Sequence, residues 1–471
     1  MTQFDMIIRG GTVVTASDTI NCDVGIKDEK IIALGQTLQD DSARIIDAEG
    51  LLVMPGGVDS HVHIDQPSGP GVVMADDFDT GTLSAMCGGN TTVIPFALQD
   101  KGQTLREAVE IYHKQAEGKS WIDHSFHVII SDPTPSALGQ ELPALVEDGY
   151  TSFKVYMTYE GLHLNDREII DLLESSKRHG AFIMVHAEGY DTLRYMIEKL
   201  EGEGRTEPVG HALSRPQVVE REATHRAISL AEFIDVPMLL VHVSGREPME
   251  QIRWAQQRGL KIFAETCPQY LLLTKDDLMK DGMEGAKYIC SPPPRDPDSQ
   301  EACWEGLQQG VFKIFSSDHC PFLIEGTSGK LREGDKTKFS RVANGVPGIE
   351  TRLPILFSEG VKKGRIDLNE FVALGSTNHA KLYGLYPQKG TIAVGSDADV
   401  VLWDADKKVT IRQDILHHNC DYTPYEGLEV TGWPLTVLSR GKVVMENGEV
   451  TGVCGHGRYL KRNKSPHAAS Q

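Results

Sequence analysis

The stretch DREIIDLLESSKRHGAFIMVHAE, residues 166–188, contains the pattern that decides the fold. Its first part has one apolar stripe at helical spacing, formed by Ile169, Ile170, Leu172 and Leu173. Basic residues near the end suit the negative end of a helix dipole, and Gly180 provides a C-cap. The apolar run that follows predicts a buried strand with His186 at its carboxyl end. The unit is therefore a helix, a glycine that ends it, and a strand with a polar residue at its carboxyl end.

The same order of elements recurs along the chain. Strands preceded by a helical segment are YTSFKVYM, VPMLLVHVS, LKIFAETC and VFKIFSSDHC, and strand-like runs occur earlier in LLVMPGGVDSHVH, TTVIPFAL and SFHVII. About eight apolar strands alternating with helices predict an α/β fold, a (β/α)8 TIM-like barrel, whose active groups lie at the carboxyl ends of the strands. Lys154, His242 and Asp318 lie at or near three of these strand ends.

Both ends of the chain predict a small β domain beside the barrel. MIIRGGTVV, DVGIK and KIIALG near the start, and ADVVLWD and LTVLSRGKVVMENGEV near the end, are short strand patterns with no helix between them. We expect residues 1–54 and 386–455 to form one β-sandwich and residues 55–385 to form the barrel. The basic tail, 456–471, is expected to be loosely ordered or docked on a neighbouring subunit.

The composition restricts the class of partner. The 471 residues carry a formal net charge of -20, which repels nucleic acid and anionic lipid. No apolar run is long enough to span a bilayer, and the first residues, MTQFDMIIRGG, do not resemble a secretion signal. The cysteines occur singly, which is typical of reduced thiols. We therefore expect a cytoplasmic protein that binds small molecules or other copies of itself, and neither nucleic acid nor membranes.

Residues 57–69, GVDSHVHIDQPSG, place two histidines on one side of a strand. Residues two apart on a strand face the same way, so His61 and His63 point into one space. A single pair of this kind also occurs without a metal. The metal interpretation gains weight from His186, His242 and Asp318 at other strand ends, because imidazoles with a carboxylate suit zinc or a similar divalent ion.

Lys154 is the candidate for a bridging group. Five ligands are too many for one tetrahedral ion, and two neighbouring ions normally share a ligand. Burial and cationic neighbours lower the pKa of an amine, and a neutral amine can add carbon dioxide to become a carbamate, which acts as a carboxylate. The alternative is that Lys154 forms an ion pair with Glu188 or Asp318.

The motifs GVDSHVH, SFKVYMTY, VHAE, LLVHVS and SSDHC, with GSDADVVLWD near the end, resemble the amidohydrolase superfamily and, within it, the D-hydantoinase/dihydropyrimidinase family. The resemblance covers nearly the whole chain through HALSRP, ETCPQYLLL, SPPPRD and NGVPGIETR. It implies two Zn²⁺ or other divalent ions per chain. The implied ligands are His61, His63 and Asp318 for one ion, His186 and His242 for the other, and carboxylated Lys154 as a bridge together with a hydroxide.

Three further positions depend on the resemblance alone. Tyr159 matches a tyrosine that steadies the oxyanion, while Ser291 and Asn344 match positions whose backbone groups hold the imide edge of the ring. Other polar residues in family-like stretches are interpreted as supporting or core residues: His127, His211, His319, Glu188, Glu265 and Cys320.

The resemblance implies hydrolysis of a cyclic amide, a hydantoin or a 5,6-dihydropyrimidine, to the N-carbamoyl amino acid. On this expectation, a bridging hydroxide would attack the ring carbonyl, and Asp318 would transfer the proton to the leaving nitrogen. The alternatives are another cyclic amidohydrolase (an allantoinase, a dihydroorotase or an imidase) and a non-catalytic dihydropyrimidinase-like structural protein. The complete ligand set argues against the last of these. A homotetramer is expected by analogy.

The loops give expectations about the substituent of the substrate. IDQPSGPGVVMADD, PFALQDKGQ and the run GGNTT with Asn90 depart from the family pattern, and we expect them to cover this group. Asp65 stands where dihydroorotase-like relatives carry an arginine that clamps a carboxylate. We therefore expect neutral rings to be preferred to dihydroorotate, unless Asp65 points away. An apolar or aromatic substituent would then lie against Pro70, Val72, Val73, Met74 and Tyr156.

Overall fold

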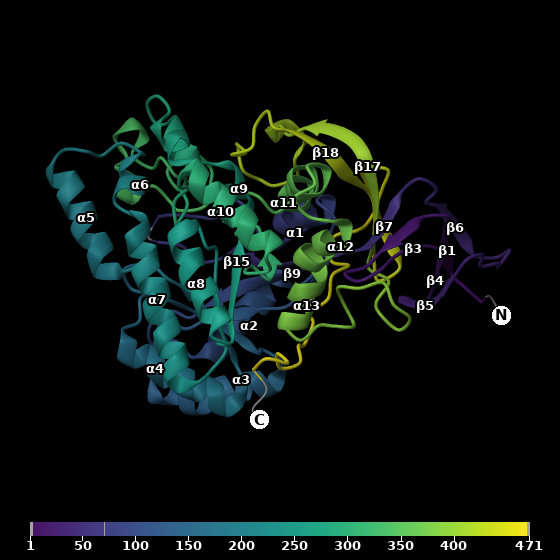
Figure 1. The fold of residues 1–471 in the computed structure, drawn as a ribbon, viewed down its shortest axis with the longest axis horizontal. Helices are drawn as coiled ribbons and strands as arrows, with labels where there is room; N and C mark the ends of the chain where they lie inside the picture. Colours follow the sequence, from purple (N-terminus) through teal and green to yellow (C-terminus); the bar gives the residue numbers. More distant parts are fainter. Residues whose placement is uncertain (1–2, 70, 469–471) are drawn as a thin grey trace.

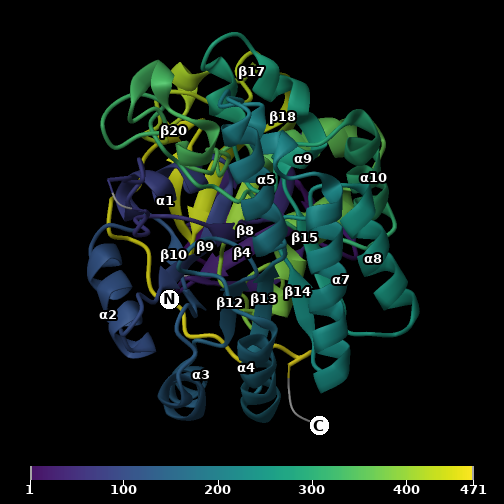
Figure 2. The same ribbon diagram turned by 90° about the vertical axis from the view of Figure 1, so that its left-hand side faces the viewer.

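The computed structural model describes residues 3–69 and 71–468. Its central element is a parallel barrel (Figures 1 and 2). The barrel strands are β8 (Gly57–Val62), β9 (Asn90–Leu98), β11 (His127–Ile129), β12 (Ser152–Tyr156), β13 (Phe182–His186), β14 (Met238–Leu240), β15 (Ile262–Thr266) and β16 (Ile314–Phe315), with the short β10 (Asp123–His124) preceding β11 along the same edge of β9. The predicted (β/α)8 architecture is confirmed.

The barrel closes where its first and last strands meet. Val62 of β8 forms a parallel bridge with His319, which follows β16. The backbone N–H of His63 donates to the carbonyl of His319 at 2.7 Å. Because closure occurs at the carboxyl ends of β8 and β16, it brings the HVH motif beside the segment that carries Asp318.

Helices surround the barrel, as Figure 2 shows. Those that follow successive strands are α1 (Phe78–Cys87), α2 (Leu105–Ala116), α3 (Leu142–Asp148), α4 (Asp166–His179), α7 (Gln217–Ile234), α8 (Arg246–Gln257) and α10 (Pro297–Gln308). Shorter or additional helices are α5 (Tyr190–Gly202), α6 (Gly210–Leu213), α9 (Pro268–Leu272), α11 (Arg352–Ile355), α12 (Leu368–Val372) and α13 (Asn378–Leu382). None of the helices in the described ranges has the length and hydropathy needed to cross a membrane.

Helix α4 shows why the opening pattern folds as it does. Asn165 and Glu168 form a capping box at its start, which satisfies backbone N–H groups that have no partner within the helix. Gly180 ends the helix with φ 73°, a conformation that costs glycine little. Ile169, Leu172 and Leu173 are buried, whereas Ile170 is only partly buried. The chain then enters β13, which presents His186.

The two chain ends form two smaller sheets. One has the order β5-β4-β1-β6 and the other β20-β19-β18-β17-β7-β2-β3. Their strands are β1 (Met6–Arg9), β2 (Thr12–Val14), β3 (Thr19–Asn21), β4 (Asp23–Lys27), β5 (Lys30–Gly35), β6 (Arg44–Asp47), β7 (Leu52–Pro55), β17 (Val400–Thr410), β18 (Glu429–Ser439), β19 (Lys442–Glu446) and β20 (Glu449–Val450). One apolar cluster contains residues of both sheets, including Ile8, Val53 and Val400, so the sheets pack as the predicted sandwich.

We propose domain boundaries that follow these sheets. Residues 1–54 and 386–455 are assigned to the sandwich, 55–385 to the barrel and 456–471 to a C-terminal tail. The antiparallel pairing of β7 with β17 supports this division, because it joins the N-terminal part of the sandwich directly to the C-terminal part.

The expectation of a loosely ordered tail is wrong within its described residues, while docking on a neighbouring subunit stays a prediction. The segment crosses its own barrel (Figure 1, yellow), where the Leu460 N–H donates to the His124 carbonyl at 2.7 Å. Arg462 is only 3% exposed. Its guanidinium donates to the hydroxyl of Ser125 at 2.9 Å, the hydroxyl of Ser152 at 2.7 Å and the carbonyl of Phe126 at 2.5 Å. These contacts fix the tail to the chain from which it comes.

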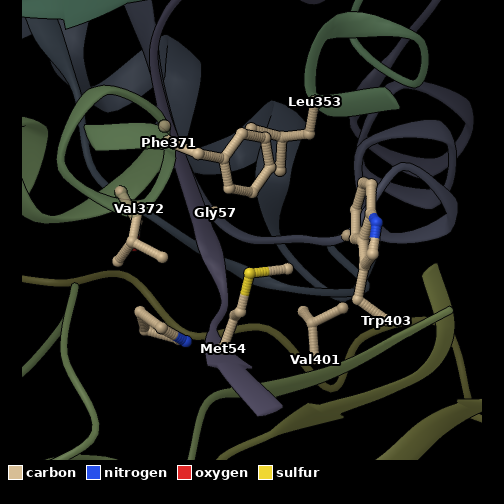
Figure 3. Close-up of a pocket in the computed structure, with 11 residues that line it drawn as sticks. Met54, Gly57, Leu353, Phe371, Val372, Val401 and Trp403 are labelled. Carbon is tan, nitrogen blue, oxygen red and sulfur yellow. The ribbon is translucent and has the colours of Figure 1, made fainter. Parts of the chain in front are cut away.

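Barrel and sandwich share an apolar junction, shown in Figure 3. Met54, Leu353, Phe371 and Trp403 line a small gap there beside Gly57. A Cβ atom at Gly57 would lie 2.7 Å from Cδ1 of Leu353 and 2.6 Å from Oδ1 of Asn90, so glycine permits the close approach of β8 to this wall. The junction therefore places the start of β8, the strand that carries His61, beside the sandwich residues Met54 and Trp403.

Replacing Trp403 with alanine is expected to lower the free energy of unfolding by about 3–5 kcal/mol, because a large side chain that is only 1% exposed leaves a cavity behind. Its ring packs against Phe357 and Phe371, with centroids 5.2 and 5.7 Å away. Urea unfolding measures the change. Trp254→Ala is the matched control: this tryptophan is 39% exposed, so a comparable loss there would contradict the assignment of the effect to the junction.

Candidate metal centre

The six predicted metal-site residues come from five barrel strands. His61 belongs to β8 and His63 follows it directly, Lys154 lies in β12 and His186 ends β13. His242 and Asp318 lie shortly after β14 and β16. In a parallel barrel these strand ends share one face, and all six side chains are buried. The structure brings the whole set together.

Short distances connect the six side chains. The Lys154 ammonium donates to Nε2 of His61 at 2.7 Å, and the same nitrogen lies 3.2 Å from a carboxylate oxygen of Asp318. Nε2 of His63 is 3.4 Å from that carboxylate oxygen. On the other side, Nε2 of His242 lies 2.8 Å from Nδ1 of His186. One potential ligand atom from each of His61, His242 and Asp318 lies within 4.8 Å of the others.

Acceptors behind the histidines orient their inner nitrogens. Nδ1 of His61 donates to Glu265, and Nδ1 of His63 donates to the side-chain carbonyl of Gln66 at 2.7 Å. Nε2 of His186 donates to Glu188 at 2.7 Å. Each acceptor fixes the proton on the outer nitrogen, so the lone pair of the inner nitrogen faces the centre. Glu188 and Glu265 therefore support the candidate ligands, as expected from the sequence.

The protonation states suit a cation. Burial lowers the pKa of His61 and His242 well below 6.5 and also lowers the pKa of His186, so these imidazoles are neutral. Burial lowers the pKa of the Lys154 amine to about 8. Within the described residues, Nδ1 of His242 is buried without a hydrogen-bond partner. Neutral imidazoles, a carboxylate and an amine that readily loses its proton fit a divalent metal centre.

Three residues at this face have backbones in the left-handed region. Tyr159 has φ 71°, His242 φ 38° and Asp318 φ 49°. Residues other than glycine adopt this region at an energetic cost, and such residues concentrate at functional sites. Each follows a barrel strand, so the turn redirects the side chain toward the barrel mouth.

A cavity of about 690 Å³ opens above the centre. Its lining includes His63, Lys154, His186, His242, Asp318, Tyr159, Ser291 and Asn344. Tyr159 is partly buried, and burial raises the pKa of its hydroxyl, so the hydroxyl remains a hydrogen-bond donor. The volume is that of a site for a small organic molecule.

Comparison with known proteins decides the family. The model of the amidohydrolase family matches residues 52–444. D-hydantoinase of Rhizobium radiobacter is 45% identical over 461 residues, which cover 98% of this chain and 99% of that protein. This chain belongs to the D-hydantoinase/dihydropyrimidinase family. The D-hydantoinase of Geobacillus stearothermophilus is also 45% identical, over 97% of this chain and 96% of the relative.

The structures of this family agree with the fold. The crystal structure of dihydropyrimidinase from Brevibacillus agri NCHU1002 has a TM-score of 0.95 and 44% identity, and the match covers 98% of this chain and 99% of the other. The amidohydrolase relationship implies a divalent metal centre, for which this chain has candidate ligands. The alternative of a non-catalytic relative is not favoured, because D-hydantoinases match nearly the whole chain at 45% identity.

Several expectations about the loops of this hydantoinase-family chain need correction. Asp65 is not among the residues that line the cavity; it is half-buried near Lys119 and Asp77, so the alternative in which it points away applies. Val73 is 63% exposed and does not line the cavity. Val72, Met74 and Tyr156 do line it, while Pro70 lies outside the described residues.

Asn90 also has a different place from the expected one. It starts β9, at the end of the barrel opposite the metal-centre candidate. Its side-chain N–H groups donate to the carbonyls of Ala85 at 3.0 Å and Ile349 at 3.2 Å, and its side-chain oxygen accepts from Arg352. Asn90 therefore joins barrel segments and does not cover a substrate.

The sequence patterns do not identify the basic residues that line the cavity. Lys101, Arg332 and Arg341 line it, yet none belongs to a strand end or to a family motif. The only sequence signal was the departure of the loop PFALQDKGQ, which contains Lys101, from the family pattern.

Proposed function

We propose that this chain opens a hydantoin or a 5,6-dihydropyrimidine to the corresponding N-carbamoyl amino acid. The main support is that Lys154, the histidines and Asp318 converge at the floor of a cavity. The chain also has D-hydantoinase relatives at 45% identity. Hydrolysis of a cyclic amide needs an activated water, a stabilised oxyanion and a proton for the leaving nitrogen. The site offers a candidate for each of these.

Two divalent ions are part of this proposal. His61, His63 and Asp318 would hold one ion, His186 and His242 the other, and Lys154, carboxylated by carbon dioxide, would be a ligand of both. When bound, the ions supply Lewis acidity and a water of lowered pKa. The Lys154 amine lies 2.7 Å from Nε2 of His61, which supports its position between the two ions. The pKa of the Lys154 amine is about 8, which supports the neutral form that reacts with carbon dioxide. Among the described residues, the hydrogen-bond partner of the Lys154 amine is His61 and neither Glu188 nor Asp318 forms an ion pair with it, which disfavours the ion-pair alternative.

The proton transfers are assigned to Asp318. Burial opposes the ionisation of Asp318, but the hydrogen bond with His63 acts in the other direction; the pKa of Asp318 is lowered, so the carboxylate can accept a proton. It takes the proton from the attacking water and gives it to the ring nitrogen as the amide bond breaks. Tyr159 donates its hydroxyl hydrogen to the developing oxyanion. Backbone groups of Ser291 and Asn344 hold the imide edge of the ring.

The finer assignments are also proposals. We infer that the ions are zinc, because imidazole and carboxylate ligands suit it. A homotetramer is inferred by analogy with the family, and a cytoplasmic location from the sequence. The substrate is a small cyclic amide, and the net charge of -20 disfavours nucleic acid and membranes as partners.

A substrate panel tests the function. Turnover of hydantoin, 5-phenylhydantoin, dihydrouracil, allantoin, dihydroorotate and succinimide is measured with metal-loaded protein. Ring opening of a hydantoin or dihydrouracil at the highest kcat/KM is expected. If allantoin, dihydroorotate or succinimide is opened most efficiently, the reaction class holds and the proposed substrate is wrong.

Elemental analysis is expected to find about two divalent ions per chain, as a shared ligand between neighbouring ions requires. His61→Ala should lower both the metal content and the rate, since His61 approaches both Lys154 and Asp318. His225→Ala is the control: this histidine is on α7, where its ring bonds Gln251 at 3.0 Å and packs against Trp254. Full activity after chelation, with no metal detectable, would refute the metal centre.

A further inference from the structure

A fully buried lysine lies behind the wall of the substrate cavity. Lys330 is 0% exposed and is not among the residues that line the cavity. Burial lowers the pKa of its ammonium to about 8, so the surroundings oppose the charge. Burying a charged group costs free energy unless hydrogen bonds or an ion pair offset the loss of water. The proposed hydrolysis assigns no step to Lys330, so its burial calls for another explanation.

Two backbone carbonyls accept hydrogen bonds from the Lys330 ammonium. Its Nζ donates to the carbonyl of Ile289 at 2.8 Å and to the carbonyl of Ala343 at 3.0 Å. Within residues 3–69 and 71–468, no carboxylate forms an ion pair with Lys330. The ammonium therefore joins two loop segments that are distant in the sequence, and it does not neutralise a buried acid.

These two segments carry the residues that are proposed to hold the imide edge of the ring. Ile289 lies two positions before Ser291, and Ala343 directly precedes Asn344. Both Ser291 and Asn344 line the cavity. The backbone N–H of Gly345 also donates to the carbonyl of Ile289, at 3.0 Å, so this carbonyl accepts bonds from the second segment and from the ammonium together. Lys330 thus closes the contact between the two segments directly behind the candidate ring site.

Each segment also has a contact of its own with the barrel. The buried His211 donates from Nε2 to the carbonyl of Cys290 at 2.8 Å, which holds the first segment. The backbone N–H of Cys320 donates to the carbonyl of Val346 at 3.1 Å, which holds the second. Lys330 differs from both groups because it bonds the two segments at once. Its loss would therefore act on their separation.

We propose that Lys330 is a positioning residue, which holds the segments of Ser291 and Asn344 at a fixed separation and thereby sets the affinity for the imide edge of the substrate. The proposal rests on the proposed function, because it uses the backbone groups of these two residues as the ring contacts. Groups that are already in place when a ligand binds lose less conformational entropy than mobile ones. Lys330 does not touch the ring and acts only through the two segments.

Lys330→Met tests the proposal, because methionine keeps an unbranched side chain but has no N–H group. Metal-loaded full-length protein is used with the ring that the wild type opens most efficiently. KM should rise roughly tenfold while kcat stays within about threefold, since a weakened contact with the ground state appears in KM. The metal content should match that of the wild type, because no candidate ligand is changed. A KM within about twofold of the wild-type value in folded protein would overturn the proposal.

Lys330→Gln provides the same test if Lys330→Met does not fold. Its uncharged amide can still donate to a carbonyl, so its KM should lie between those of the wild type and the methionine variant. Thermal unfolding is measured on every variant, because a purely structural role of Lys330 would lower Tm and leave the KM of the folded protein unchanged.

Lys336→Met is the matched control, since Lys336 is an exposed lysine of the same segment. It should keep the wild-type KM, and an equal rise in KM there would contradict the role of Lys330. If the wild type opens rings and the Lys330 variants keep its KM, only this proposal fails. If the wild type opens no ring, the proposed function fails and this proposal fails with it.

Discussion

Replacing Lys154 with alanine is expected to lower the rate of ring opening by about a thousandfold or more, because groups that act as one catalytic unit are not replaced by the remaining ones. Lys154 approaches His61 at 2.7 Å within a buried centre. It is the one residue proposed to bind both ions while taking no part in proton transfer. Steady-state kinetics and elemental analysis of the variant measure the effect on rate and on metal content.

Two comparisons distinguish a carbamate from an ammonium ion at this position. Lys154→Arg should not restore activity, because a guanidinium is permanently charged and cannot add carbon dioxide. Propionate, but not propylamine, should partly rescue Lys154→Ala by supplying a small carboxylate. An unmodified amine, seen in the mass or crystal structure of active, metal-loaded protein, would show that the carbamate assignment is wrong.

Asp318→Asn is expected to reduce kcat by about a thousandfold or more, because the amide cannot accept and return a proton at the same place. The side-chain oxygen of asparagine can still contact the centre, so the metal content should fall far less than kcat. Metal analysis and kinetics on the same preparation measure both quantities.

Asp65→Asn is the matched control for Asp318→Asn. Asp65 is only half-buried and lies outside the cavity lining, so its kcat/KM for neutral hydantoins should remain within about twofold of the wild-type value, as for surface changes away from special features. Equal losses in the two variants would refute the proton-transfer role of Asp318.

The barrel and the candidate ligands could be predicted because local patterns specify them. In helix α4 and strand β13, apolar spacing, the C-cap glycine and the terminal histidine all act within one short segment. Parallel strands then bring distant segments to one face, so His186 and Asp318 meet without any contact that the sequence must show directly.

Contacts made by loops could not be predicted in the same way. The backbone of Asp65 has φ 51°. The direction of its side chain therefore does not follow from the alternation of side chains along a strand. Arg332 reaches the cavity because Lys330 binds carbonyls of two other segments, a contact without a local pattern. Arg462 likewise donates to acceptors more than 300 positions earlier in the chain. No local pattern shows these contacts, and the basic residues around Arg462 by themselves suggest an exposed tail.

The buried Arg462 has a consequence for biosynthesis. Its guanidinium satisfies two serine hydroxyls and one carbonyl beneath β12, the strand that carries Lys154. While Arg462 is still inside the ribosomal tunnel, its guanidinium cannot reach these acceptors. In the same way, β7 cannot pair with β17 until β17 has left the tunnel. The barrel therefore reaches its final form only after Arg462 has left the tunnel, and until then its unfinished edge needs protection from aggregation.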